Sequence, residues 1–200
     1  MWAYESVFYQ IYPIGFCGAP RVSGRRTVSD VFGNKERPMF FKKKEAGSDG
    51  RLLAVQTGLV MPVSEVDDPV FAQSILGGGV AIRPEGNEVL SPASGRIISV
   101  QDTGHAYGLR TDDGMEILVH IGINTMELKG RGFSPCVRTG QKIRRAEPLC
   151  RIDLPLLRQL GYQTDIMVLV TNQAELSGQL RFYSGMRAQA GQTCIIERIR

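Results

Sequence analysis

The chain has 200 residues, 42% of them hydrophobic, and a formal net charge of +4 at pH 7. This length allows one well-packed core with an appendage, and no apolar run approaches the roughly 20 residues of a membrane-spanning helix. The four cysteines are scattered without CxxC spacing, which indicates neither a zinc cage nor a disulfide framework; we expect reduced thiols in a soluble, cytoplasmic protein.

The N-terminal segment differs from the rest of the chain in composition. Residues 2–20 are rich in aromatic side chains at their start and resemble the opening strand of α-amylase-type glycoside hydrolase barrels. Such a barrel needs about 200 or more residues, and nothing after Pro20 continues the resemblance, so we infer no glycosidase function. Residues from about 21 to 50 are polar and basic, as in a linker, and lack the interleaved aromatic residues of a nucleic-acid-binding surface. We therefore predict a poorly ordered prefix at residues 1–50 and a folded domain at residues 51–200.

Short apolar runs recur in the second part of the chain, separated by Gly, Pro, Asn and Asp. Regular short strands with turn signals between them predict an all-β protein, an antiparallel β-sandwich or barrel. The runs comprise residues 59–63, 80–82, 95–100, 107–110, 115–121, 148–152, 166–170 and 193–199.

One or two short helices are expected among these strands. Residues 154–160 are the clearest helical stretch, because Asp153 can cap the first turn and Gly161 can end the last one. A second short helical turn is expected at residues 69–74.

The chain has only two histidines, His105 and His120, on either side of the turn signal Asp112-Asp113-Gly114. The short runs that flank this signal are expected to pair as a hairpin. Either of two possible two-residue loops places the histidines on one face, diagonally or directly opposite each other. A three-residue loop places them on opposite faces, because side chains alternate along a strand. Two of the three registers therefore predict a histidine pair.

His120 belongs to the less apolar of the two rows along its strand, as an exposed or cleft-lining residue would. The row with His120 contains Glu116, Leu118 and Gly122, and the other row contains Ile117, Val119, Ile121 and Ile123. A pair of imidazoles can bind a metal, act in general acid–base catalysis, or take part in phosphoryl transfer with one ring as nucleophile. The pattern alone leaves these three uses open.

Longer motifs carry a family resemblance over roughly three-quarters of the chain. They include Thr103-Gly-His-Ala106 and Val119-His-Ile-Gly-Ile123, with further matching segments at residues 55–62, 68–72, 79–84, 90–92, 95–97, 127–133, 140–143 and 152–157. These ordered and correctly spaced segments resemble the glucose-type enzyme IIA domain of the bacterial sugar phosphotransferase system. The resemblance implies the same β-sandwich, with both histidines in a shallow depression on one face.

The same resemblance implies a role for three residues. His120 would become phosphorylated, His105 would be its partner histidine, and Thr103 would hydrogen-bond to His105 and orient it. The phosphocarrier HPr would donate the phosphoryl group, and a cysteine of the enzyme IIB domain of a sugar permease (enzyme IIB/IIC) would receive it. No cofactor, metal, nucleic acid or membrane insertion is implied.

Two other functions remain as alternatives. One is a regulatory protein-binding module of the same fold without phosphotransfer. The other is a zinc-dependent hydrolase of the lysostaphin type, which needs metal ligands beyond the two histidines. A biotinyl or lipoyl carrier is disfavoured, because the hairpin tip at residues 112–114 has no lysine.

The sequence also departs from the family pattern at three positions. Gly78 and Asn124 replace residues that are commonly acidic, and Gly104 stands where the pattern has Asn. The two lost carboxylates would lessen repulsion of a phosphoryl group and weaken docking of a carrier protein. Neither histidine is affected.

Overall fold

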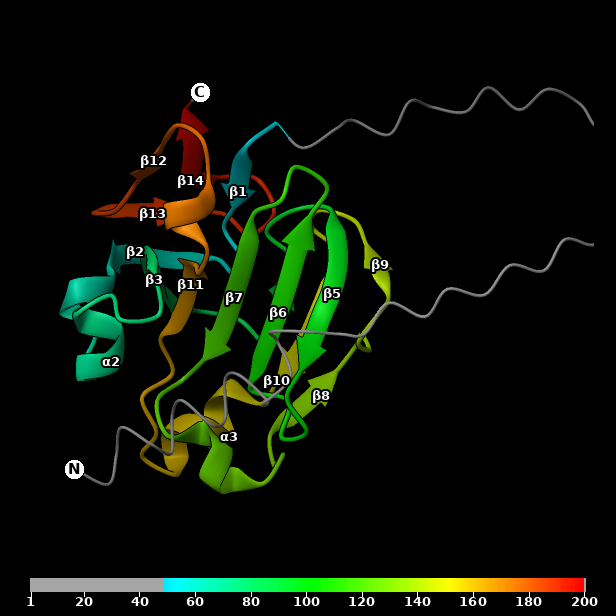
Figure 1. Ribbon diagram of the computed structural model, residues 1–200. Helices are drawn as coiled ribbons and strands as arrows, with labels where there is room; N and C mark the ends of the chain where they lie inside the picture. The colour runs from blue at the N-terminus through cyan, green and yellow to red at the C-terminus, as the bar shows by residue number, and fades with distance from the viewer. Residues whose placement is uncertain (1–48, 200) are drawn as a thin grey trace, which may run out of the picture. The chain divides into compact units, whose positions relative to one another are not determined.

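The computed structural model describes residues 49–199, which lie within one unit formed by Gly47–Arg200. The expected prefix and linker fall outside the described residues, apart from positions 49 and 50. The described part consists mostly of antiparallel strands with two short α-helices (Figure 1), which confirms the predicted all-β class. Within it, no helix is long and apolar enough to cross a membrane.

Residues 49–199 contain fourteen strands and three 3₁₀ turns besides the two α-helices. The strands are β1 Arg51–Leu53, β2 Gly58–Pro62, β3 Gly78–Pro84, β4 Glu88–Leu90, β5 Gly95–Val100, β6 Ala106–Thr111, β7 Glu116–Ile121, β8 Phe133–Pro135, β9 Lys142–Ile143, β10 Pro148–Ile152, β11 Ile166–Val170, β12 Gln179–Phe182, β13 Met186–Ala188 and β14 Cys194–Ile199. The 3₁₀ turns are η1 Val63–Glu65, η2 Thr125–Leu128 and η3 Gln173–Glu175.

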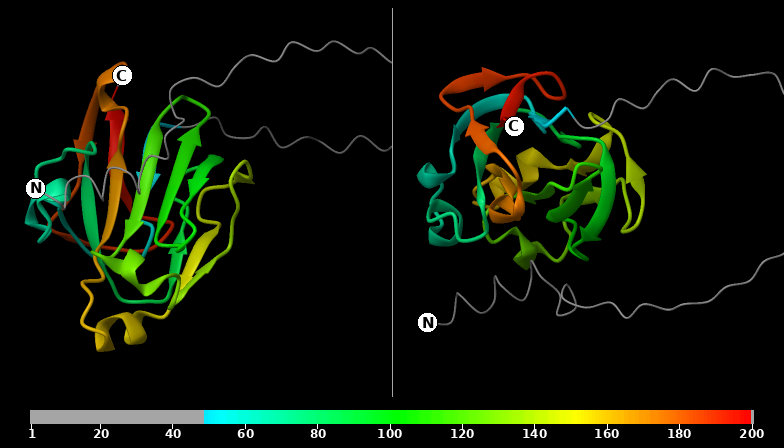
Figure 2. Two further views of the ribbon diagram at one scale, coloured as in Figure 1. Left: turned by 60° about the horizontal axis from the view of Figure 1, so that its bottom comes forward. Right: turned by 45° about the horizontal axis from the view of Figure 1, so that its top comes forward.

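The strands form three sheets. The largest has eight strands in the order β13-β2-β3-β11-β7-β6-β5-β9, and the two others have three strands each, β1-β14-β12 and β4-β10-β8. The C-terminal strands β12, β13 and β14 gather at one end of the unit, next to the C-terminus, as both further views show (Figure 2). In the large sheet, β7 contains His120 and lies between β11 and β6, and His105 immediately precedes β6.

Both short helices form where the sequence predicted them. Helix α2 comprises Pro69–Ala72, and the carboxylate of Asp68 caps it by accepting hydrogen bonds from two backbone amides. Helix α3 comprises Leu154–Gln159, and the carboxylate of Asp153 accepts a hydrogen bond from the amide of Leu156 at 3.0 Å. Gly161, just beyond α3, has a φ of +82°, the left-handed conformation that ends helices.

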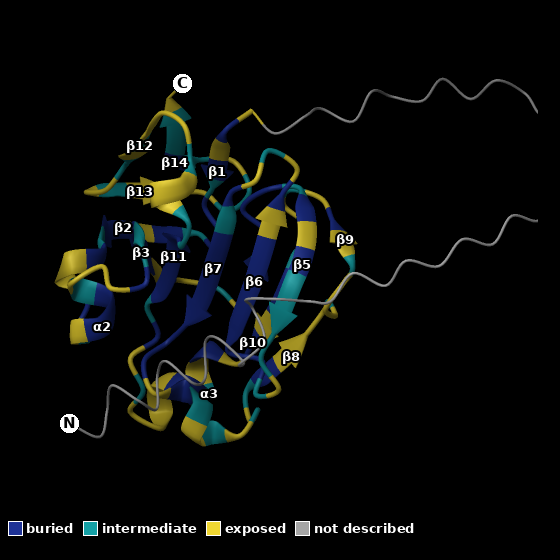
Figure 3. Cartoon of the chain, viewed as in Figure 1, coloured by how far each residue is buried: buried dark blue, intermediate teal, exposed yellow. Residues whose placement is uncertain are grey.

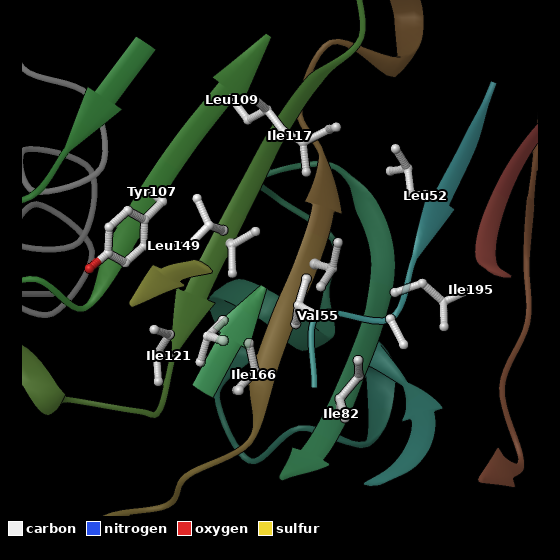
Figure 4. Packing of buried hydrophobic residues seen from close by; sticks show 14 of the residues in the cluster. Leu52, Val55, Ile82, Tyr107, Leu109, Ile117, Ile121, Leu149, Ile166 and Ile195 are labelled. Atoms are coloured by element: carbon white, nitrogen blue, oxygen red, sulfur yellow. The ribbon is translucent and has the colours of Figure 1, made fainter. Parts of the chain in front are cut away.

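The two faces of β7 meet different surroundings. Ile117, Val119 and Ile121 point into the main core, together with Tyr107 and Leu109 from β6 (Figure 4). The opposite row, which contains Leu118 and His120, lies outside that core cluster but is also buried (Figure 3). Burial on both sides explains why so short a strand is almost entirely apolar.

Candidate functional site

The two histidine rings lie against each other. His120 lies in β7, directly opposite Ala106 of β6 on one side and Met167 of β11 on the other. His105 immediately precedes β6. The ring centroids are 4.9 Å apart and the ring planes meet at 83°, an edge-to-face arrangement. The expected histidine pair is therefore present.

Of the three registers considered for the hairpin, the one that forms is the one that did not predict a histidine pair. Arg110 pairs with Glu116, and the amide of Thr111 donates to the carbonyl of Met115 at 2.9 Å, so residues 112–114 form a three-residue connection. We expected this register to place the histidines on opposite faces. The alternation rule holds only within an extended strand, and His105 lies outside β6, next to Gly104 with a φ of +68°.

The turn before His105 is held by its backbone and by one side chain. The amide of Gly104 donates to the carbonyl of Gln101 at 2.7 Å, and the carbonyl of His105 accepts from the amide of Ile121 at 2.8 Å. The hydroxyl oxygen of Thr103 lies 2.5 Å from Nδ1 of His105. If the hydroxyl donates this hydrogen bond, the proton of the His105 ring resides on Nε2.

Both histidines are more deeply buried than the shallow depression in the sequence analysis implies. Exposed fractions are 3% for His105 and 7% for His120. Burial lowers the pKa of His120 to about 3, the neighbouring His105 adds to this effect, and the Gly122 backbone opposes it. Burial alone lowers the pKa of His105 to about 4. Both rings are therefore neutral near pH 7, the state in which an imidazole nitrogen is nucleophilic.

The two nitrogens of the His120 ring differ in their surroundings. Nδ1 is buried and has no hydrogen-bond partner of ordinary geometry among the described residues. The backbone of Gly122 opposes the lowering of the His120 pKa and so favours a proton on this ring. Gly122 has a φ of +74°, and a Cβ there would lie 2.4 Å from Cγ2 of Thr125 and 2.8 Å from the Gln163 carbonyl oxygen. Only glycine fits this position.

Phe71 is a neighbour of the pair that the sequence analysis did not single out. Its ring centroid lies 5.0 Å from that of His120, with the planes tilted by 54°. Phe71 belongs to α2, and the Asp68 carboxylate that caps this helix accepts from the amides of Val70 and Phe71 at 2.8 and 3.4 Å. The sequence signal for Phe71 was an acidic cap residue, Asp68, followed by an aromatic residue in the same short helix. This signal does not reveal which histidine the Phe71 ring contacts.

One departure from the family pattern has a local structural reason. A Cβ at Gly78 would lie 2.6 Å from Oε1 of Gln173 and 2.8 Å from Cζ of Phe182, so these side chains occupy the space that a carboxylate needs. Asn124 has a φ of +57°, and it precedes η2. Aspartate tolerates this left-handed conformation as asparagine does, so the structure does not explain the departure at position 124.

No third ligand joins the histidines among residues 49–199. That part of the chain contains no group of three or more His, Cys, Asp or Glu side chains arranged to hold a metal ion. The arrangement consists of two neutral imidazoles, one hydroxyl and one aromatic ring. Such a set can donate and accept hydrogen bonds and can offer a nitrogen to an electrophile.

Comparisons with known proteins give matches over most of the chain. The family described as "phosphoenolpyruvate-dependent sugar phosphotransferase system, EIIA 1" matches residues 50–176. The "PTS system glucose-specific EIIA component" of Staphylococcus aureus (strain Mu50) is 34% identical over 161 residues, which cover 80% of this chain and 96% of the relative.

Two further proteins are similar to this chain: one is a larger protein, and the other has a solved structure. The "PTS system mannose-specific EIIBCA component" of Corynebacterium glutamicum is 38% identical over 153 residues, which cover 76% of this chain and 22% of that protein. The structure of glucose permease IIA from Mycoplasma capricolum is similar with a TM-score of 0.65 and 28% identity, over 73% of this chain and 93% of that one.

Proposed function

This chain belongs to the EIIA family of the phosphoenolpyruvate-dependent sugar phosphotransferase system and is a phosphoryl-carrier component of that system, and we propose that it carries the phosphoryl group on His120. The observation that carries this proposal is the buried, neutral pair of imidazole rings with centroids 4.9 Å apart. We assign the ring proton of His120 to its enclosed Nδ1 and the attack on phosphorus to Nε2, because the Gly122 backbone favours a proton on this ring and Nδ1 is the buried nitrogen.

The transfer proceeds between two phosphohistidines. The phosphocarrier HPr presents its phosphorylated imidazole, Nε2 of His120 attacks phosphorus, and the new N–P bond forms as the old one breaks. The hydroxyl of Thr103 donates to Nδ1 of His105, so that Nε2–H of His105 donates to a phosphoryl oxygen. A cysteine thiolate of enzyme IIB then attacks the same phosphorus and releases His120 unphosphorylated.

A transfer assay with two histidine variants tests this assignment. Radiolabelled phospho-HPr should give the wild-type chain an acid-labile, base-stable label, and His120→Gln should take none. His105→Gln should still accept label but pass it to enzyme IIB about 100-fold more slowly, the loss typical of removing one donor to transition-state charge.

The two variants act as controls for each other, because both place glutamine in the same buried site. Label on His120→Gln would overturn the assignment of the acceptor. Equal onward transfer by His105→Gln and wild type would overturn the role of His105. A wild-type chain that binds HPr but takes no label would support the regulatory protein-binding alternative instead.

A further inference from the structure

The position of His105 needs an explanation that strand geometry does not supply. The backbone carbonyl of His105 pairs with the amide of Ile121, which continues the register of β6 and β7 by one residue pair. In an extended strand, His105 would then share the core-facing side with Tyr107 and Ile121. Its ring instead meets His120, which belongs to the opposite row. The bend at Gly104 must therefore be held in place by other groups.

Tyr107 makes a hydrogen bond to this bend. Its side chain is fully buried (Figure 4), and its hydroxyl donates to the carbonyl oxygen of Gly104 at 2.9 Å. Burial raises the pKa of Tyr107, and the neighbouring Cys150 adds to this effect, so the hydroxyl stays protonated and remains a donor. The Sγ of Cys150 lies 3.8 Å from the same carbonyl oxygen and 3.2 Å from the carbonyl oxygen of Arg151, and its single hydrogen can serve only one of them. The Tyr107 hydroxyl is thus the donor of ordinary length to this backbone group, and Cys150 packs beside it.

Gly104 has no side chain through which the bend could be held. A Cβ there would lie 3.0 Å from Cγ of Pro135 and 3.2 Å from Cβ of Phe133, and the φ of +68° adds strain for any larger residue. The carbonyl of Gly104 is therefore the group on which the Tyr107 hydroxyl acts. It lies between Thr103 and His105, the two residues that form the 2.5 Å contact.

We propose that Tyr107 is a positioning residue for phosphoryl transfer, whose hydrogen bond to Gly104 holds the bend at residues 103–105 so that the His105 ring faces His120. Cys150, from the neighbouring sheet, contacts the same carbonyl oxygen. The proposal rests on the proposed function, because the oriented His105 ring is the donor to the phosphoryl oxygen. Tyr107 acts through the backbone and does not touch the phosphoryl group.

Tyr107→Phe removes only the hydroxyl and keeps the ring in the core. Onward transfer to enzyme IIB should fall about tenfold, the rate change that corresponds to one lost hydrogen bond, while His120 still accepts label from phospho-HPr. In ¹⁵N NMR spectra of the unphosphorylated chain, the two ring nitrogens of His105 should move toward the averaged shifts of mixed tautomers. Tyr183→Phe is the matched control, because it removes a hydroxyl that donates to Glu197 at 2.8 Å. It should change neither transfer nor the His105 signals.

The outcomes separate this proposal from the function on which it rests. If wild type takes no label on His120, the proposed function fails, and the His105 spectra of Tyr107→Phe still decide whether Tyr107 positions the ring. Unchanged His105 signals in Tyr107→Phe overturn the positioning role, whatever the transfer rate. Should Tyr107→Phe fail to fold, Cys150→Ala gives a second measurement: a smaller shift of the His105 signals in the same direction supports the proposal, and unchanged signals overturn it.

Discussion

At the scale of single residues, burial sets the protonation state of both histidines. Removing an imidazole from water disfavours its charged form, which lowers the pKa of His105 to about 4 and that of His120 to about 3. In the unfolded chain both would titrate near the ordinary value of about 6.5. The folded chain therefore binds fewer protons than the unfolded chain between these limits.

This difference predicts how stability depends on pH. Because the unfolded state binds more protons, the free energy of unfolding falls as the pH drops below about 6.5, by up to roughly 1.4 kcal/mol per pH unit for each histidine. The contribution of the two neutral histidines to the free energy of unfolding is fully present above pH 6.5. It is lost as the pH falls, down to about pH 4 for His105 and about pH 3 for His120. Urea unfolding at pH 7, 6, 5 and 4.5 should show this slope in wild type.

The double variant His105→Gln/His120→Gln isolates the histidine contribution. It lacks both titrating rings, so its free energy of unfolding should change less over the same pH range, and only through the carboxylates that both proteins share. Parallel curves for the two proteins would show that the rings titrate alike in the folded and unfolded chains, contrary to the burial argument.

For His105, the sequence predicted the identity of the site residue but not the direction of its ring. The motif Thr-Gly-His-Ala identified the residue and its neighbour Thr103, whereas the alternation rule assigned it to the wrong face for the register that forms. The rule failed because the backbone bends at Gly104, whose carbonyl accepts a hydrogen bond from Tyr107 and contacts Cys150, a residue far away in sequence. Phe71 was missed for the same reason, since its contact with His120 joins two separate elements.

At the scale of elements, the short helix α2 brings an aromatic ring to the site. It has only four residues, and the Asp68 carboxylate satisfies two of its free amides, including that of Phe71. Losing such a cap costs about 1 kcal/mol, which is a large share of what so short a helix can contribute. The position of Phe71 against His120 therefore depends on Asp68.

Asp68→Ala should lower the free energy of unfolding by about 1 kcal/mol and slow acceptance of label from phospho-HPr severalfold. Asp153→Ala makes the same change at the cap of α3, so it should cost similar stability and leave label acceptance unchanged. Urea unfolding and the initial rate of label transfer measure the two effects. Slower acceptance in both variants would indicate a general loss of stability and not a role of α2 in the site.

Strands of five residues or more were predictable, and shorter ones were not. The runs at residues 95–100, 148–152 and 166–170 match β5, β10 and β11 without error. Strands β4, β8 and β9 have two or three residues, too few to show a period of two. Such short strands form because a neighbouring strand already offers free backbone groups, which depends on the tertiary structure.

At the scale of the whole unit, a largely buried ion pair joins the C-terminal strand to the hairpin that carries His120. The guanidinium of Arg198 in β14 lies 3.4 Å from the carboxylate of Asp113 at the hairpin tip, and the two side chains are 8% and 12% exposed. The same guanidinium donates to the carbonyl and the hydroxyl of Ser177, both at 2.9 Å. Because β14 belongs to a three-stranded sheet and the hairpin to the eight-stranded one, this pair links two sheets.

Removing one partner of a buried ion pair leaves the other charge in a site that water solvates poorly. Arg198→Met should therefore lower the free energy of unfolding by about 3 kcal/mol, and adding Asp113→Asn should recover part of that loss. Arg51→Met is the matched control on the neighbouring strand β1, because it breaks a pair with Glu197 in which the Arg51 side chain is 56% exposed.

The urea midpoint of Arg51→Met should stay close to that of wild type, since solvent screens an exposed pair. Equal shifts in Arg198→Met and Arg51→Met would mean that burial does not distinguish the two pairs. The link between the sheets would then rest on the apolar core alone. A loss of stability confined to Arg198→Met, with partial recovery in the double variant, would instead show that the ion pair itself couples the C-terminal strand to the hairpin that carries His120.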